Sequence, residues 1–414
     1  MQVVMNAVIG FFRSIFSARN ITLRNFTLFI LVLMTIQYIP LESRAGVSPI
    51  KVAMMAIVPF VLIKYIKITK ATIIIAGYFL YILLTAGIIH TESFRASTVF
   101  YLLMFLITYM AFYQFVWIEK VLSLSFFINF VRNFIFVLVG VLVVQQCFIV
   151  IGIKQVPLIN LCQVFDRGIG ANSLTFEPSS LARILGVLYY AYLKCCEYRQ
   201  GHSVHILEIF GSEHRIVTLS FLWAMLTMGS GTAFICLGFL SLYFMKGFYT
   251  IIAIPVFVGV YFVLTFFQVE QFQRAQGVVD ATMTGDVNVV LKEDRSAGMR
   301  LKPMMHTLSL DLHDFESWVG WGCDSARKSG QYGDLRYLGQ IGDYGIISYL
   351  IELVLIFSCS ISFFSLPTLM LFAGIGGGVS NISYGWGMLM VLSCVKYFHD
   401  NYQPSCNDTQ EVIR

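Results

Sequence analysis

Long apolar runs separated by short polar stretches dominate the chain from one end to the other. A transmembrane helix needs about 20 mainly apolar residues, and about twelve runs approach that length. Several are short or interrupted by glycine, most clearly around Gly229–Thr232 and Gly374–Tyr384, where tight hairpins or half-helices are expected. The predicted spans are residues 26–41, 50–63, 71–89, 98–116, 134–153, 179–195, 216–229, 232–246, 249–267, 342–364, 366–380 and 384–397. We therefore predict an all-α integral membrane protein with about 12 transmembrane helices.

The composition supports this prediction. Of 414 residues, 57% are hydrophobic and 12% are charged, whereas a soluble domain carries roughly 25% charged residues. So little charge cannot cover a water-facing surface, which excludes a soluble enzyme and a disordered scaffold. The formal net charge of +5 is weak, and the chain has no basic run with interleaved aromatic residues, so nucleic-acid binding is not expected.

Lysine and arginine indicate the orientation, because cytoplasmic loops of membrane proteins carry an excess of them. With the N-terminus inside, fourteen of these residues fall on the cytoplasmic side and six in the short external loops. Both termini are therefore predicted to be cytoplasmic. This topology divides the chain into a cytoplasmic interfacial segment (1–25), nine spans (26–267) with an external loop at 154–177, a large external loop (268–341), three final spans (342–397) and a cytoplasmic tail (398–414).

The first polar cluster predicted to lie at the outer face starts at Glu177. Pro178 suits the first turn of a helix, and Ser179 and Ser180 lie four and three residues before Arg183, so one helix face presents two hydroxyls and a guanidinium. The positive end of the helix dipole adds to this charge and favours an anion, particularly a phosphate. Glu177 could accept a proton from a hydroxyl. The alternative is a capped helix in which Arg183 pairs structurally with Glu177.

The second cluster lies in the large external loop, which is locally basic between Lys292 and Lys302. If this segment is helical, Arg295 and Lys302 share a face. His306 follows Lys302 by four residues, and nearby cations favour the neutral imidazole that a general base requires. The alternative is a solvated run of charges.

Glycines mark two further places. In the hairpin at Gly229–Thr232, the hydroxyls of Ser230 and Thr232 could line a cavity, or the segment could be a plain turn. Glycine pairs at 320–322 and 342–345 allow a neighbouring backbone to approach closely, which packing alone explains.

Motifs of soluble enzymes are absent from the sequence, and the nine cysteines follow no metal-ligand spacing. Two of them, Cys162 and Cys323, fall in predicted external segments and could form a disulfide or stay apart. We expect no His, Cys and carboxylate set with metal geometry, and hence no metal or other cofactor. Any chemistry would use arginines, hydroxyls and a carboxylate or histidine at the outer face.

About twelve spans with one large external loop before the last three resemble the Wzy-type polymerases of O-antigen and capsular polysaccharide, and the related O-antigen ligases. The resemblance covers residues 160–390, and its most specific part is the Glu-Pro-Ser core at the start of a helix. The similar segments are Arg167-Gly168-x-Gly170, Phe176-Glu177-Pro178-Ser179-x-Leu181-Ala182, the small-residue hairpin Gly229-Ser230-Gly231-Thr232, Arg300, Gly320-x-Gly322 and Gly342-x-x-Gly345. Ligases carry a histidine motif shortly before the last glycine pair, where this chain has Asp334, and this departure favours the polymerase.

The resemblance implies a membrane glycosyltransferase that acts without metal at the periplasmic face of the bacterial inner membrane. Its donor is a glycan on undecaprenyl diphosphate, and its acceptor is one lipid-linked repeat unit. The implied catalytic residues are Glu177, Arg183, Arg300 and His306. The implied binding residues for diphosphate and glycan are Arg167, Ser179, Ser180, Ser230, Thr232, Arg295, Lys302, Asp334 and Arg336. The lipid bilayer is the other expected partner, and a chain-length-regulating co-polymerase is left open.

Three alternatives remain at this point. An O-antigen ligase would move the glycan onto a lipid A core. A lipid-linked oligosaccharide flippase or transporter would also line a cavity with arginines, but such proteins usually show internal two-fold repeats, and none is visible in the sequence. An accessory membrane subunit without activity would leave the outer polar clusters unexplained.

Overall fold

The computed structural model describes most of the chain, and every regular element among the residues it describes is helical. The described residues are 9–11, 22–37, 48–153, 168–245, 270–284, 286–293, 295–323, 340–362, 365–370 and 383–402, with single positions at 255, 258, 259, 262, 265, 266 and 338. Several expectations fall outside them: most of segment 1–25, most of the span predicted at 249–267, the hairpin near Gly374 and most of the C-terminal tail. Cys162 also lies outside them, so both alternatives for Cys162 and Cys323, a disulfide or two separate cysteines, stay open.

The helices follow the apolar runs closely. The first half of the chain contains α2 (Leu23–Thr35), α3 (Pro49–Ile63), α4 (Lys70–Leu84) continued by η2 (Thr85–Ile89), η3 (Thr91–Ser93), α5 (Ala96–Tyr113) continued by η4 (Gln114–Ile118), α6 (Leu124–Val150) and α7 (Pro178–Gln200). The second half contains η5 (Glu208–Phe210), α8 (Arg215–Thr227), α9 (Gly231–Phe244), α11 (Glu270–Met283), α12 (Val287–Glu293), α13 (Arg295–Leu308), α14 (Phe315–Val319), α16 (Ile341–Cys359), α17 (Leu366–Leu369) and α18 (Ser383–Asn401).

Four of these helices are long and apolar enough to cross a membrane: Lys70–Ile89, Ala96–Ile118, Leu124–Val150 and Ile341–Cys359. Four shorter apolar helices, α2, α3, α8 and α9, accompany them. The chain is therefore a helical, membrane-embedded protein. The number of twelve spans and the cytoplasmic position of both termini stay predictions.

Helices α7 and α18 are also long, with 23 and 19 residues, but they are less apolar. Every residue of α7 from Pro178 to Leu193 is buried, and so is nearly all of α18. Both helices pack against each other, and α18 also packs on α2 and α5. Because neighbouring helices rather than lipid enclose them, polar side chains on α7 and α18 can find partners inside the protein.

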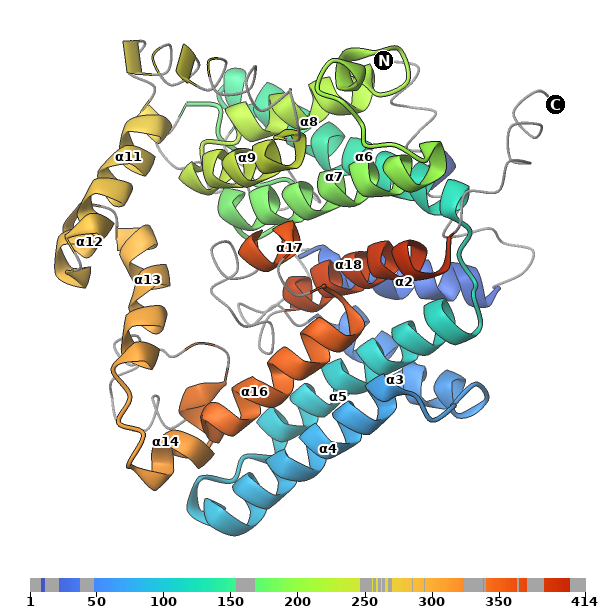
Figure 1. The fold of residues 1–414 in the computed structure, drawn as a ribbon, viewed down its shortest axis with the longest axis vertical. Coiled ribbons are helices and arrows are strands. Elements are labelled where there is room, and N and C mark those ends of the chain that lie inside the picture. Colours follow the sequence, from blue (N-terminus) through green and yellow to red (C-terminus); the bar gives the residue numbers. More distant parts are fainter. Residues whose placement is uncertain are drawn as a thin grey trace.

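The bundle has two groups of helices joined through α2 and α18. Helices α6, α7, α8 and α9 form one group and α3, α4, α5 and α16 the other, with α2 and α18 between them (Figure 1). The yellow and orange helices α11, α12 and α13 form a column along one side of the bundle, from α9 towards α14 (Figure 1). The large loop predicted at 268–341 is therefore mostly helical where it is described, and the basic segment at 295–302 is helical as considered in the sequence.

The bundle has two ends, and at one of them segments that are far apart in the chain meet. The C-terminal parts of α7 and α18 are in contact there, with the Tyr198 and His399 ring centroids 5.8 Å apart, and Lys67 Nζ of the 64–69 loop lies 3.0 Å from Glu119 Oε1. We call these loops, with the 201–214 segment, the α7 C-terminal end. At the α7 N-terminal end lie the starts of α3, α7, α9 and α18 and the junction of α14 with α16.

The predicted close approach of the glycine pairs is confirmed at this junction. The Trp321 and Gly322 N–H groups donate to the carbonyls of Gly342 and Asp343 at 3.0 and 3.2 Å. Gly345 has a φ of 76°, and a Cβ on it would overlap the Trp318 carbonyl. Packing of two backbones, with no room for side chains, therefore explains why glycine stands here.

The tight turn predicted between two short spans is also confirmed. Helix α8 ends at Thr227 and α9 begins at Gly231, and Gly229 between them has a φ of 73°. That conformation favours glycine. The turn needs only three residues, so α8 and α9 lie side by side and antiparallel.

Candidate functional site

The segment before α7 is folded into the bundle. The Ser173 N–H donates to Gln145 Oε1 at 2.6 Å, and Gln145 Nε2 donates back to the Ser173 carbonyl at 3.1 Å. The Ser173 hydroxyl donates to the Leu138 carbonyl at 2.6 Å. One glutamine of α6 thus satisfies both backbone groups of a buried loop residue, as a polar segment inside an apolar bundle requires.

The end of α2 holds the other side of this segment. The Gln37 N–H donates to the Leu174 carbonyl at 2.8 Å, and the Phe176 N–H donates to Gln37 Oε1 at 3.2 Å. The Thr175 hydroxyl also donates to the Glu177 carbonyl at 2.9 Å. These bonds fix the position at which Glu177 enters α7.

Glu177 is the N-cap residue of α7, with extended backbone, and Pro178 occupies the first turn as the sequence predicts. The Ser179 hydroxyl donates to Glu177 Oε1. Glu177 is half-buried, while Ser179 and Ser180 are buried. The carboxylate therefore lies at the positive end of the α7 dipole and is oriented by a neighbouring hydroxyl.

Arg183 lies one and a half turns further along α7 and is only 8% exposed. Its Nη1 donates to the Tyr384 hydroxyl at 2.9 Å, and its buried Nε has no hydrogen-bond partner among the described residues. No described carboxylate forms an ion pair with it, so the alternative in which Arg183 pairs with Glu177 is not what the structure has. A buried guanidinium with one neutral partner is thus placed near the positive end of a helix.

A second buried cation, Lys51, stands beside it on the adjoining helices. Its Nζ donates to the Ile36 carbonyl at 2.7 Å and to the Ser383 hydroxyl at 3.0 Å, and the residue is 1% exposed. Ser383 and Tyr384 are consecutive, so Lys51 and Arg183 hold neighbouring residues at the start of α18. Neither Lys51 nor Tyr384 is predicted from the sequence as part of this site.

The hairpin hydroxyls come to the same end of the bundle. Two contacts show that α7 and α9 run parallel. Gly186 lies against Cys236, and later in both helices the Tyr243 hydroxyl donates to Glu197 at 2.8 Å. Buried Ser230 and Thr232 lie about one turn before Cys236, and Arg183 lies about one turn before Gly186. The structure therefore places the hairpin hydroxyls at the level of Arg183.

The predicted residues of the large loop are placed less completely. Lys302 and His306 are half-buried on α13, which packs on α12, and the Leu338 N–H donates to the Thr307 hydroxyl at 3.1 Å. Arg295 and Arg300 belong to the same helix, but their side chains lie outside the described part. Arg167, Asp334 and Arg336 also lie outside the described residues. A site shared by α13 and the start of α7 stays a prediction.

Among the described residues, one group of metal-ligand type occurs that the sequence did not lead us to expect. His202, His205 and Glu208 lie together at the α7 C-terminal end. The signal in the sequence is a His-x-x-His-x-x-Glu spacing outside any predicted helix, and it matches no established motif. This group is separate from the residues at the start of α7.

Comparisons with protein-family models, with curated proteins and with solved structures give no match to this chain. Any statement about its function therefore depends on its own residues and on their arrangement.

Proposed function

We propose that the protein is a polysaccharide polymerase that joins undecaprenyl-diphosphate-linked oligosaccharide repeat units at the periplasmic face of the inner membrane, in O-antigen, capsule or exopolysaccharide biosynthesis. The observation that supports this best is the buried Arg183, which has a neutral partner in Tyr384 and a buried Nε with no described acceptor.

A buried cation without a counter-ion is costly, because desolvation of a charge in a protein interior costs several kcal/mol. The start of α7 adds further positive potential at the same place. Both effects favour a bound anion. A guanidinium binds two phosphate oxygens at once, which suits the diphosphate of a polyprenyl-linked sugar.

In the proposed reaction, a hydroxyl of the acceptor repeat attacks the anomeric carbon of the donor sugar. The bond from that carbon to the diphosphate oxygen breaks with inversion, and the hydroxyl proton passes to a base. Glu177, already within a hydrogen bond of the Ser179 hydroxyl, is the first candidate for that base, and His306 is the second.

Arginines stabilise the charge that develops on the departing diphosphate, and Arg183, Arg300 and Arg295 are assigned this role. Arg167 and Lys302 are assigned to the diphosphate of the donor or acceptor, and Asp334 and Arg336 to the glycan. Ser179, Ser180, Ser230 and Thr232 supply hydroxyls on the α7 and α9 side. Because diphosphate is a good leaving group and the arginines neutralise it, the proposed transfer step itself needs no metal, and EDTA is expected to leave the transfer rate of the folded protein unchanged.

The test is complementation of a strain that lacks the protein, read as the length distribution of surface polysaccharide on gels. Arg183→Ala and Arg300→Ala should insert normally yet lose long chains, with transfer falling about 100-fold or more, as when one charge-stabilising donor is removed. Arg183→Lys should also be poor, because a point charge does not replace a planar fork. Arg199→Ala is the matched control, since Arg199 stands at the other end of α7 and pairs with Glu213.

Three outcomes would contradict the proposal in different ways. Full-length polysaccharide from both Arg183→Ala and Arg300→Ala would refute the arginine assignment. Loss of transfer to a lipid A core, with polymer length intact, would identify a ligase. Accumulation of single lipid-linked repeats on the cytoplasmic side would identify a flippase.

A further inference from the structure

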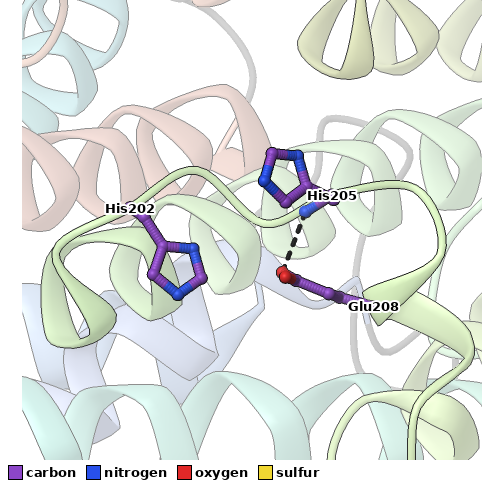
Figure 2. A group of neighbouring side chains, drawn as sticks. All are labelled: His202, His205 and Glu208. Atoms are coloured by element: carbon purple, nitrogen blue, oxygen red, sulfur yellow. Dashed lines mark hydrogen bonds between the residues drawn. The ribbon is translucent and has the colours of Figure 1, made fainter. Parts of the chain in front are cut away.

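The segment that joins α7 to α8 brings together three side chains that the proposed reaction does not use. Helix α7 ends at Gln200, its C-cap residue Gly201 has a φ of 76°, and the chain then passes through His202, His205 and Glu208. Their ligand atoms all lie within 4.8 Å of one another, and the Glu208 carboxylate extends towards both imidazole rings (Figure 2).

The backbone of this segment is already held in place. Val204, directly before His205, and Ile209, directly after Glu208, are buried in the bundle. The His205 N–H donates to Glu208 Oε2 at 3.0 Å, and the Glu208 N–H donates to the His205 carbonyl at 3.0 Å. A ligand that binds here therefore orders few additional groups, which favours its affinity.

Hydrogen bonds also determine which atoms are available. His202 Nδ1 lies 3.2 Å from the Ser203 carbonyl. A carbonyl only accepts, so Nδ1 carries the hydrogen and Nε2 keeps the lone pair that ligates a metal. On Glu208, Oε2 accepts the His205 N–H, which leaves Oε1 as a ligand atom.

The geometry points to a site for one divalent transition-metal ion, with Zn²⁺ as the best fit, bound by His202, His205 and Glu208. Two imidazoles and one carboxylate form a typical three-ligand set, with water in a fourth position. Imidazole favours zinc, copper and nickel over magnesium and calcium, which require oxygen ligands. Ligand atoms in a tetrahedral zinc site are roughly 3.3 Å apart, so these atoms, which lie within 4.8 Å of one another, must move closer when the ion binds, and the exposed His202 side chain has room to do so.

This site is independent of the proposed polymerase reaction. It lies at the α7 C-terminal end, about 33 Å along the helix from Glu177. The nearby His214 is not part of it, because its Nδ1 is 2.9 Å from the Tyr192 hydroxyl. A bound metal would join the end of α7 to the segment that leads into α8, and so would stabilise the folded bundle.

The experiment is a titration of untagged, metal-stripped protein in detergent with Zn²⁺ by calorimetry, and with Co²⁺ by visible absorption. Wild type should bind one equivalent and melt at a higher temperature with Zn²⁺, because the metal binds the folded state. His202→Ala and His205→Ala should weaken binding by about tenfold or more, and Glu208→Gln by a similar factor. His313→Ala is the matched control, since His313 is an exposed histidine on another segment and should bind as wild type does.

The proposal is overturned if wild type binds no Zn²⁺ at micromolar concentrations, or if His205→Ala binds it as tightly as wild type. It is also overturned if His313→Ala loses binding as strongly as His205→Ala. Melting temperatures without metal show whether each variant is folded, and Glu208→Gln, which keeps shape and volume, tests the site even if a histidine variant is not.

Discussion

At the scale of single residues, two buried cations organise the place where four helices start or end. Lys51 donates to the carbonyl of Ile36, the C-cap residue of α2, and to the Ser383 hydroxyl, and Arg183 donates to the Tyr384 hydroxyl. Lys51 has a carbonyl and a hydroxyl as hydrogen-bond acceptors, whereas Arg183 donates to one hydroxyl and its buried Nε has no acceptor among the described residues. Lys51 therefore joins the end of α2 to the start of α18, and Arg183 keeps a donor that suits the anionic substrate proposed above.

This difference predicts that replacing Lys51 lowers stability, whereas replacing Arg183 lowers the proposed transfer activity. Lys51→Met keeps the length and apolar part of the side chain but leaves the Ile36 carbonyl without its donor, so the free energy of unfolding should fall by about 1–3 kcal/mol. Thermal unfolding in detergent measures it. In Lys67→Met, the control, an exposed ion pair with Glu119 is lost, which should cost at most about 1 kcal/mol. Equal losses in both variants would show that Lys51 does not hold the α2–α18 contact.

Of the two buried pairs, Arg183 with Tyr384 and Lys51 with Ser383, the sequence identified only Arg183 as a site residue. Glu177, Ser179 and Arg183 were identified because helix-start chemistry is local: proline, hydroxyls and charge within seven residues. Lys51 is one of the six charges that the sequence assigns to the short external loops, and Tyr384 belongs to a segment expected to form a tight hairpin or half-helices. Their partners are 332 and 201 residues away in the chain, and no local pattern encodes a contact over that separation.

At the scale of elements, the crossing of α14 and α16 depends on glycine. Gly345 combines a φ of 76° with extended ψ, a conformation nearly restricted to glycine, and its hydrogen faces the Trp318 carbonyl. Gly345→Ala should therefore destabilise the fold by about 1–3 kcal/mol, seen as a lower melting temperature.

Gly77 on the adjacent α4 provides the contrast, because a Cβ there meets nothing within 4 Å. In a helix interior, alanine is favoured over glycine by about 1 kcal/mol, so Gly77→Ala should raise the melting temperature slightly. The two substitutions are chemically identical, and only the surroundings differ. A melting temperature for Gly345→Ala at or above wild type would contradict the close approach.

Hydropathy predicted the positions of most helices but not which of them lipid surrounds. Apolar runs at 71–89, 98–116, 134–153 and 342–364 correspond to the four long apolar helices. Helix α7 was predicted as a span of the same kind, yet protein encloses it along most of its length. Hydropathy measures composition, and both lipid and a protein interior accept apolar residues, so the sequence alone could not separate the two environments.

At the scale of the whole molecule, the alternation of helices places two kinds of chemistry at opposite ends. The start of α7, with Glu177 and Arg183, lies at one end, and the His202, His205 and Glu208 group lies at the other. The distribution of lysine and arginine predicts that the first end is outside the cell membrane and the second is cytoplasmic. That orientation is required for a reaction on glycans that have already been exported.

Two single-cysteine variants at positions of nearly equal exposure test this orientation. Met283 on α11 and Ile68 between α3 and α4 are 84% and 86% exposed, so a thiol at either position is equally accessible in the protein itself. The background replaces Cys147, Cys162 and Cys406 with serine and keeps the buried cysteines, and it should not be labelled. A membrane-impermeant maleimide should label Met283→Cys in intact cells, and Ile68→Cys only after permeabilisation. The reverse pattern would place Arg183 on the cytoplasmic side, where exported lipid-linked repeats are not found, and the proposed polymerase reaction would fail with it.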